Sequence, residues 1–329
     1  MSGHELRRDA PSSQDSPRNL RGSRDSAEFV RGQVTVGVSL KTYFGHERAR
    51  AWFGEVARRV GAHPAVAAGQ VRFFVIPTYV QIPGALAAFA GTPVLVGAQD
   101  VSEYEPGAYT GEVSAAELAE IGVAVAEIGH AERRRLFGET DEITARKAAA
   151  ALTHGLTPVL CVGETDRLQA TDTSTRSSLS ASAAATATIA QLRADLTGAP
   201  AGPVIAAYEP VWAIGAPEPA PTDHITAVTT ALTEALAADP ARAGSVVIYG
   251  GSAGPGLLTT LGDAVDGLFL GRFAHDPDAL VAVLDEASAL AASRDTTAAR
   301  HQPNTETASI DRSLVTPVQS RGTDAGGAA

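Results

Sequence analysis

The sequence predicts an α/β protein built as one (β/α)8 barrel, and two observations carry this prediction. Eight short apolar runs recur between residues 34 and 270, and both faces of these runs are apolar, as in parallel strands that are buried on both sides. A longer, Ala-rich segment of helical character follows each run. Eight such units within about 240 residues have the size of a single barrel rather than of two domains.

The expected strands follow one another at intervals that leave room for a helix between them. In chain order they cover residues 34–40, 71–76, 93–98, 123–128, 158–162, 204–208, 246–249 and 267–270. The segment after the first strand has an apolar stripe at helical spacing, formed by Ala49, Trp52, Phe53, Val56 and Val60. Residues 171–188 are almost entirely Ser, Thr and Ala, which fits either a weak helix start or a mobile insertion.

The two ends of the chain differ in composition from the part between them. Residues 1–33 and 293–329 contain few large apolar side chains, so we expect disordered tails on either side of a barrel domain at 34–292. Neither end has the continuous apolar stretch of a signal peptide or membrane anchor. The net charge of −11 argues against a nucleic-acid-binding surface. The single cysteine, Cys161, excludes an internal disulfide, and we expect a cytoplasmic protein.

The residues that directly follow each apolar run are the candidates for chemistry, because barrels of this class carry their sites at the carboxyl ends of the strands. Glu209 directly follows the sixth run, and an apolar segment from Pro210 to Gly215 comes after it. A carboxylate at the rim, beside a segment that can fold over it, suits proton abstraction in a pocket closed to water.

Other strand ends add a cation, a histidine and two glycine turns. Lys41 follows the first run and can serve as a fixed positive charge for a phosphate or a developing oxyanion. His130 follows the fourth run at the start of a helical segment. The turns at 250–252 and 271–272 expose backbone N–H groups that can face an anion after the seventh and eighth strands.

Together these stretches resemble the triosephosphate isomerase family over roughly residues 34–290. The strings that carry the resemblance are Gly129-His130-Ala131-Glu132-Arg133-Arg134, Cys161-Val162-Gly163-Glu164-Thr165, the segment from Ala207 to Gly215, and Tyr249-Gly250-Gly251-Ser252. The resemblance implies a TIM-barrel isomerase of a short phosphorylated sugar with Glu209 as catalytic base. It also implies that Lys41 and a neutral His130, its pKa lowered by a helix N-terminus, stabilise an enediolate. It implies neither a metal nor an organic cofactor, and it leaves Cys161 as a small buried apolar residue.

The same resemblance implies a phosphate site and a partner subunit. Gly215, Ser252, Gly271 and Arg272 are the expected phosphate-binding residues, and Ser39 is expected to belong to the substrate-binding residues as well. The loop from Gln99 to Ser114 resembles the long third loop of the family, which reaches into the site of the partner subunit and makes the enzyme a homodimer. The alternative is an ordinary surface loop that ends in a helix N-cap at Ser114.

Several residues around the expected site depart from the family pattern. The family normally has Asn at the position of Ser39 and an aliphatic residue at that of Glu127, and further departures are Ala131, Arg272 and residues 216–219. A carboxylate on a barrel strand is costly unless it is paired, so Glu127 has either a cationic partner or a role in the site. Glu132, two residues after His130, is a further residue that can tune the site.

These departures lie around the site instead of being scattered, and they predict a pocket for a substrate with one more carbon than a triose. The combination resembles the branch of the family that interconverts L-erythrulose 1-phosphate and D-erythrulose 4-phosphate in tetritol breakdown. Triosephosphate isomerase activity is the alternative. A catalytically inactive barrel that senses or scaffolds a phosphosugar is a third hypothesis, which the retention of Glu209, His130 and Lys41 disfavours.

Overall fold

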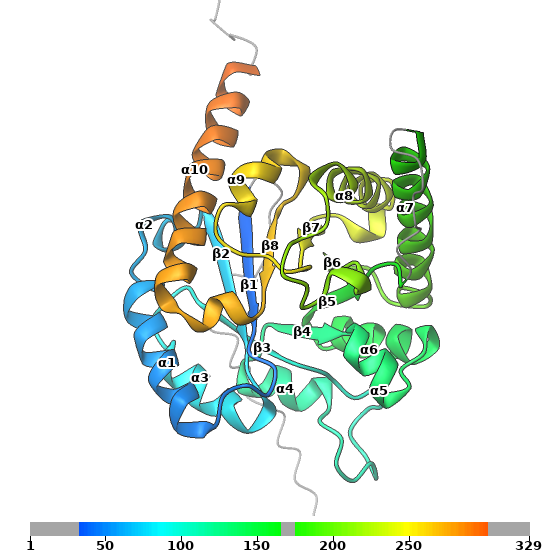
Figure 1. Cartoon of the computed structure of the whole chain (residues 1–329). Coiled ribbons are helices and arrows are strands. Elements are labelled where there is room, and N and C mark those ends of the chain that lie inside the picture. Colours follow the sequence, from blue (N-terminus) through cyan, green and yellow to red (C-terminus); the bar gives the residue numbers. More distant parts are fainter. Residues whose placement is uncertain (1–32, 166–174, 302–329) are drawn as a thin grey trace, which may run out of the picture.

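The strands form a closed parallel barrel. The computed structural model describes residues 33–165 and 175–301 of the chain (Figure 1). The strands follow one another around the barrel in sequence order, and the last pairs with the first. They are β1 (Val34–Ser39), β2 (Val71–Ile76), β3 (Leu95–Ala98), β4 (Val125–Ile128), β5 (Thr157–Val162), β6 (Ile205–Tyr208), β7 (Val246–Tyr249) and β8 (Gly267–Leu270). The predicted (β/α)8 architecture is confirmed.

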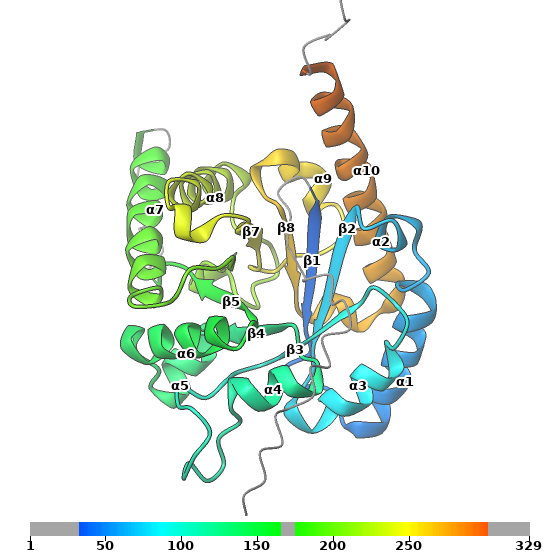
Figure 2. The same ribbon diagram turned by 180° about the vertical axis from the view of Figure 1, so that it is seen from behind.

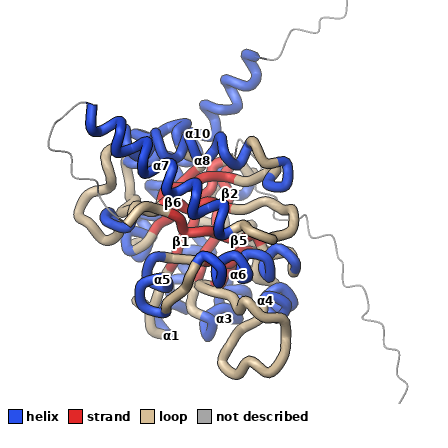
Figure 3. Tube along the Cα trace, turned by 90° about the vertical axis from the view of Figure 1, so that its right-hand side faces the viewer, coloured by secondary structure: helices blue, strands red, loops and turns tan. Residues whose placement is uncertain are grey.

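Helices surround this barrel, as Figure 2 shows from behind and Figure 3 from the side. They are α1 (His46–Arg59), α2 (Pro64–Ala67), α3 (Ile82–Ala88), α4 (Ala115–Ile121), α5 (Ala131–Phe137), α6 (Asp141–Thr153), α7 (Thr175–Asp195), α8 (Thr222–Ala237), α9 (Leu257–Leu261) and α10 (Pro277–His301). Short 3-10 turns lie in the connections at η1 (Tyr79–Gln81), η2 (Val211–Ala213), η3 (Pro240–Arg242), η4 (Gly262–Ala264) and η5 (Arg272–His275). The predicted apolar stripe of α1 is buried.

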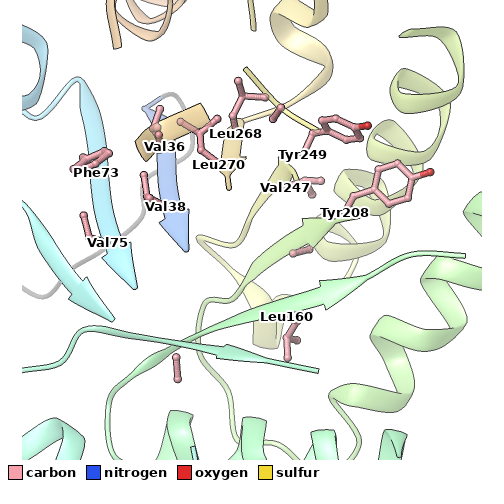
Figure 4. Packing of buried hydrophobic residues seen from close by; sticks show 14 of the residues in the cluster. Val36, Val38, Phe73, Val75, Leu160, Tyr208, Val247, Tyr249, Leu268 and Leu270 are labelled. Atoms are coloured by element: carbon pink, nitrogen blue, oxygen red, sulfur yellow. The ribbon is translucent and has the colours of Figure 1, made fainter. Parts of the chain in front are cut away.

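The strands carry apolar side chains on both faces, and these side chains form two separate clusters. The inner cluster, inside the barrel, consists of Phe74, Ile76, Val125, Val159, Cys161, Ile205, Ala207, Val246, Ile248 and Phe269. The outer cluster fills the space between strands and helices, and Figure 4 shows part of it, including Val36, Tyr208 and Leu268. Side chains alternate along a strand, so Glu127, two residues after Val125, also faces the inside of the barrel.

One glycine on β1 makes room for an aromatic ring of the inner cluster. A Cβ atom on Gly37 would lie 2.1 Å from Cζ of Phe74, so no larger residue fits at this position while the ring stays in place. Phe74 itself is fully buried and lies 5.9 Å from Phe269, centroid to centroid. The barrel interior below the site is therefore filled with side chains and is not a pore.

Most strands begin and end close to the residues that the sequence predicts. β2, β7 and β8 have the expected bounds. β3 and β4 begin two residues later than expected because strand pairing starts only at Leu95, which pairs with Phe74, and at Val125, which pairs with Gly97. Proline and glycine turns therefore predicted where the connections lie, but not at which residue strand pairing begins.

Two helices correct or complete the sequence-based picture. α7 begins at Thr175, so the Ser/Thr/Ala-rich segment is helical from that residue onward, and residues 171–174 lie outside the described residues. α10 continues to His301, past residue 292, where the barrel domain was expected to end. The remaining parts of the expected tails, 1–32 and 302–329, also lie outside the described residues.

The extension of α10 is anchored to the barrel by Arg294. Its guanidinium donates hydrogen bonds to the backbone oxygen of Val265 at 2.8 Å and to Asp263 at 2.9 Å. The sequence did not reveal this anchor because both acceptors lie about thirty residues earlier in the chain. Over the described parts of the chain, no helix combines the length and apolarity that a membrane crossing requires.

Candidate active site

A cavity of about 1050 Å³ opens at the carboxyl ends of the strands. Every residue that the sequence analysis assigned to the site lines it: Ser39, Lys41, Glu127, His130, Glu132, Glu209, Gly215, Ser252, Gly271 and Arg272. These residues come from β1, β4, β6, β7 and β8 and from the connections that follow them. The barrel topology thus brings together side chains that are up to 233 residues apart, from Ser39 to Arg272.

His130 lies at the centre of the charged groups. Its Nε2 atom is 2.9 Å from Nζ of Lys41 and 3.2 Å from Oε2 of Glu209. Lys41 in turn forms an ion pair with Glu132 at 3.2 Å. A base, an imidazole and a cation therefore meet at one point of the cavity, which is the constellation that proton transfer beside a carbonyl requires.

The backbone of α5 determines which nitrogen of His130 carries the proton. His130 is the N-cap of α5, and its Nδ1 accepts a hydrogen bond from the backbone N–H of Glu132 at 3.1 Å. In a neutral ring with Nδ1 as acceptor, the proton is on Nε2. The helix N-terminus thus aims an N–H donor into the cavity.

The expected lowering of the His130 pKa does not occur in the protein without a ligand. Burial lowers the pKa of this ring, but the negative charges of Glu209 and Glu127 outweigh it and raise the pKa above its ordinary value. The prediction considered only the helix that begins at His130 and was therefore wrong in direction. A ligand that takes the place of Glu209 beside Nε2 removes part of this stabilisation of the imidazolium.

Glu209 is 94% buried, and a glycine directly after the neighbouring strand β7 makes room for it. A Cβ atom on Gly250 would lie 2.6 Å from both Cγ and Oε1 of the carboxylate side chain. On the other side, Sγ of Cys161 is 3.9 Å from Oε1. Burial, with Glu209 adding to it, holds the pKa of Cys161 well above its ordinary value, so this thiol packs beside the carboxylate and is not a nucleophile.

Lys41 is held in a strained backbone conformation. Its φ angle is 45°, which is uncommon for a residue with a Cβ atom. The side-chain amide of Gln99 donates a hydrogen bond to the backbone oxygen of Lys41 at 2.8 Å. Burial alone would lower the pKa of Lys41, but nearby carboxylates, above all Glu209, raise it, so the ammonium group stays charged. Sequence reasoning named Gln99 only as the start of a loop and missed this contact.

Of the two alternatives for Glu127, a direct ion pair with a cation is not found among the described residues, and its hydrogen-bond partner is a hydroxyl group. Its Oε2 accepts a hydrogen bond from the Ser39 hydroxyl at 2.8 Å, and the side chain lines the cavity. Burial raises the pKa of Glu127 above its ordinary value, while the positive charges of His130 and Lys41 act in the opposite direction.

The apolar segment after Glu209, here called the lid (Pro210–Gly215), is fastened at both ends. At its start, the indole N–H of Trp212 donates to Glu164 at 2.9 Å. Five residues beyond its end, the backbone N–H of Ala220 donates to the hydroxyl of Tyr249 at 3.0 Å. Glu164 also accepts from the hydroxyl of Tyr208 and lies 2.9 Å from Nε2 of His224. Glu164 and Tyr249 belonged to strings that the sequence analysis quoted, but their role as lid partners was missed.

The expected phosphate-binding residues gather on the side of β7 and β8. The Ser252 hydroxyl lies 2.8 Å from the backbone oxygen of Ala216, so it is engaged with the segment after the lid. The φ angles of Ser252 and Gly215 are 50° and 71°, which orient their backbone groups in tight turns. The Arg272 guanidinium reaches to 4.0 Å from the place that a Cβ atom on Gly215 would occupy. A positive charge therefore lies close to the lid.

Comparison with known proteins gives the same family. A model of the triosephosphate isomerase family matches residues 34–287. L-erythrulose-1-phosphate isomerase from Pectobacterium atrosepticum is 50% identical over 264 residues, which are 78% of this chain and 97% of that protein. Triosephosphate isomerase from Thermus thermophilus is 37% identical over 260 residues, or 77% of this chain and 98% of that protein.

The fold also matches a solved structure. The crystal structure of triosephosphate isomerase from Bartonella henselae aligns with a TM-score of 0.63 at 24% identity, and the match covers 77% of this chain and 98% of that one. At this identity the likeness concerns the fold alone. The family model and the relatives, however, extend across the whole barrel with its cavity, and they are named isomerases. The chain therefore belongs to the triosephosphate isomerase family and is an isomerase of the aldose/ketose type.

Proposed function

We propose that this isomerase interconverts L-erythrulose 1-phosphate and D-erythrulose 4-phosphate. The observation that carries the proposal is the Ser39–Glu127 pair in a cavity that also holds Glu209, His130 and Lys41. The pair adds a polar group to the site without removing any of the groups that proton transfer needs. The similarity to the Pectobacterium relative supports the same substrate.

The reaction follows from the groups around His130. The carboxylate of Glu209 removes the proton from C3 of L-erythrulose 1-phosphate, and the electron pair moves to the carbonyl oxygen on C2. The N–H of His130 and the ammonium of Lys41 stabilise the resulting enediolate. His130 moves a proton between the two oxygens, and Glu209 returns its proton to C2, which leaves the carbonyl on C3. No atom is lost or gained, and neither a metal nor an organic cofactor is needed.

Substrate binding must break one contact of the ligand-free site. Nε2 of His130 lies near Glu209, and its single proton cannot serve this carboxylate and a substrate oxygen at the same time. We therefore infer that the substrate oxygen replaces Glu209 as the partner of Nε2. This exchange frees the carboxylate to act on carbon.

The phosphate is assigned to the side of the cavity formed by the connections after β6, β7 and β8. Backbone N–H groups of Gly215, Ser252 and Gly271 are the proposed ligands, together with the guanidinium of Arg272. The lid lies against this side and excludes water from the enediolate. Exclusion of water also disfavours the loss of phosphate from the intermediate.

We further propose that the enzyme acts as a homodimer in the cytoplasm, in the breakdown of tetritols such as erythritol. The loop from Gln99 to Ser114 supports the dimer because it projects from the barrel, as Figure 1 shows below α4. Tyr104 and Tyr109 stack at 4.2 Å on this loop and are 42% and 45% exposed, which leaves an aromatic surface for a partner. The Ser114 N-cap of α4 fixes the end of the loop.

The second candidate is triosephosphate isomerase activity, which the similarity to the Thermus thermophilus relative favours. The two activities share the enediolate and the base, and they differ only in the hydroxymethyl group that the tetrulose carries in addition. We would measure kcat/KM of the purified protein on L-erythrulose 1-phosphate and on dihydroxyacetone phosphate side by side. A preference for the tetrulose by a factor of about 100, or about 2.7 kcal/mol, is expected. A preference for the triose would assign the enzyme to the second activity.

An inactive phosphosugar-binding barrel is tested by a substitution at the base. Glu209→Gln keeps the shape of the side chain and removes the charge, so phosphosugar binding is expected to survive while turnover falls by several orders of magnitude. A wild-type protein that binds both phosphosugars but turns over neither would contradict the enzymatic proposal.

A further inference from the structure

Glu127 is a buried carboxylate inside the barrel that the fold itself does not require. It is 3% exposed and shares the inner face with the apolar residues Val125 and Cys161. Its one hydrogen bond in the described part of the chain runs from Ser39, which also lines the cavity. No hydrogen bond or ion pair joins Glu127 to a helix or loop within residues 33–165 and 175–301. Burying an ionised carboxylate in such surroundings destabilises the fold by several kcal/mol unless partners compensate for it. The presence of Glu127 therefore indicates a role in the cavity.

The position of Glu127 separates it from the proposed phosphate end of the cavity. β4 stands across the barrel from β8 in the closed strand order. Glu127 and Ser39 are strand residues, whereas His130 and Lys41 follow the ends of the same two strands. The Ser39–Glu127 pair therefore forms the floor of the cavity below His130 and Lys41, with Glu127 across the barrel from the proposed phosphate end and Ser39 on β1, the strand beside β8.

One carboxylate oxygen of the pair is available to a ligand. Ser39 donates to Oε2, and among the residues that the structure describes no hydrogen bond reaches Oε1. A carboxylate fixed by one hydrogen bond and open at its other oxygen is a strong acceptor for a hydroxyl group.

From this geometry we propose that Glu127, oriented by Ser39, binds the terminal hydroxymethyl group of the substrate and sets the preference for a four-carbon sugar. The inference rests on the proposed tetrulose phosphate activity. L-erythrulose 1-phosphate carries phosphate at one end and a hydroxymethyl group at the other, with the two reacting carbons between them. If the phosphate lies at β7 and β8 and C2 and C3 lie beside His130, the hydroxymethyl group reaches the floor. A triose lacks this group and leaves Oε1 without a partner.

The test combines a change in the enzyme with a change in the substrate. The enzymes are wild type, Glu127→Leu and the isosteric Glu127→Gln, with thermal unfolding of each to verify folding. The substrates are L-erythrulose 1-phosphate, its 4-deoxy analogue, which lacks the terminal hydroxyl, and dihydroxyacetone phosphate. Wild type is expected to prefer the first substrate over the 4-deoxy analogue by about 100-fold or more in kcat/KM. Glu127→Leu is expected to reduce this ratio to below about 10-fold, with its largest loss on the hydroxylated substrate.

A matched control is Glu132→Gln, another carboxylate of the cavity wall, which pairs with Lys41 instead of lying on the floor. It is expected to change kcat/KM on all three substrates by a similar factor and to leave their ratios within about threefold. Ser39→Ala is expected to lower the hydroxyl preference partially, by about tenfold, because Glu127 loses its orienting donor.

The outcomes separate the inference from the function on which it rests. If wild type itself prefers dihydroxyacetone phosphate, the proposed tetrulose activity fails. If wild type prefers the tetrulose but Glu127→Leu and Glu127→Gln keep the wild-type ratio between the hydroxylated and 4-deoxy substrates, the function stands and the assignment of Glu127 is overturned. If Glu127→Leu does not fold, the ratio measured with Glu127→Gln decides: a ratio that falls at least tenfold supports the assignment, and an unchanged ratio overturns it.

Discussion

The position of the Glu209 side chain depends on the absence of a Cβ atom at a neighbouring glycine. The carboxylate occupies the space that a side chain at Gly250 would fill, and Gly250 follows the last residue of β7. Its position is thus set from the neighbouring strand, through the absence of a Cβ atom. A base that acts on one carbon and then on the next must hold its orientation within about 1 Å.

We therefore predict that Gly250→Ala lowers kcat/KM by about 100-fold through displacement of Glu209. Gly84→Ala on α3 is the matched control, because a Cβ atom there meets nothing within 4 Å and Ala favours a helix. The control is expected to retain activity and to gain slightly in thermal stability. An active Gly250→Ala variant would mean that the carboxylate can act from a second position.

At the same scale, the sequence predicted which residues face the cavity but not their charge states. Lys41, His130 and Glu209 were found because each follows an apolar run, which is a local signal, whereas Ser39 and Glu127 were found as departures from the family pattern. Burial lowers the pKa of His130, and the charge that does most to raise it belongs to Glu209, 79 residues further along the chain. Such an effect of residues far apart in the chain cannot be read from the residues around one histidine.

Among the elements, the lid depends on acceptors that other strands provide. The backbone N–H of Ala220 donates to the hydroxyl of Tyr249, 29 residues further along the chain. The sequence predicted that the lid exists, from a proline and a glycine around an apolar segment. It did not predict the hydrogen bond to Tyr249, because the residues next to a tyrosine in the sequence do not indicate its partner on another element.

We predict that Tyr249→Phe loosens the lid, because the backbone N–H of Ala220 loses its buried acceptor. This loss destabilises the closed, packed conformation of the lid by about 1–3 kcal/mol. The expected result is a lower kcat/KM and a larger share of turnovers that release inorganic phosphate from the exposed intermediate. Phosphate release per turnover is the measurement. Tyr104→Phe, which keeps its ring and lies outside the cavity, should match wild type. Equal phosphate release by Tyr249→Phe and wild type would contradict a role of this hydroxyl in closure.

A second network of elements links α5 and α6 through Glu139. This carboxylate lies in the connection between the two helices and accepts hydrogen bonds from Lys147 and Arg133. Lys147 also donates to Asp100 at 2.7 Å, which brings the connection after β3 into the same network. Burial alone would raise the pKa of Glu139, but the hydrogen bonds from Lys147 and Arg133 lower it below its ordinary value.

The lowered pKa gives a prediction with a definite sign. Ionised Glu139 contributes stability above the pKa of an unfolded glutamate, about 4.5, and this contribution is lost as the pH falls through the lower folded pKa. Glu139→Gln is expected to lower the free energy of unfolding at pH 7 by about 3 kcal/mol. The gap to wild type should narrow below about pH 4.5, as denaturant titrations at several pH values would measure. Glu120→Gln, an exposed carboxylate on α4, should change stability by less than about 0.5 kcal/mol. A gap that widens with acidity would contradict the network.

For the whole molecule, the arrangement of strands followed from the sequence more fully than any detail of the site. Runs that were apolar on both faces predicted parallel strands, and their number predicted closure. The barrel domain was expected to end at residue 292 because residues 293–301 contain no large apolar side chain, whereas α10 continues to His301 and Arg294 anchors it to the connection before β8. A hydrogen bond between residues far apart in the chain thus fixed a helix end that composition alone did not predict.

The proposed dimer gives the prediction at this scale. Tyr104→Glu places a charge on the stacked aromatic pair of the projecting loop, so we expect it to dissociate the dimer in sedimentation experiments. Activity should fall with dissociation if the loop completes the site of the partner. A wild-type monomer at micromolar concentration would contradict the proposal. Glu105→Gln, on the same loop but removing a charge, is the control that should stay dimeric.

The pairing of β1 with β8 also bears on how the protein is made. The strand that seals the barrel is the last one to be synthesised, so a nascent chain that lacks it exposes the edges of β1 and β7. Until the ribosome has released residue 270, the growing chain cannot bury its inner face and carries two strand edges that can pair with other chains. Truncation before β8 is therefore expected to yield aggregates rather than a smaller folded domain. Chaperones that shield the nascent sheet matter most while the last strands are synthesised.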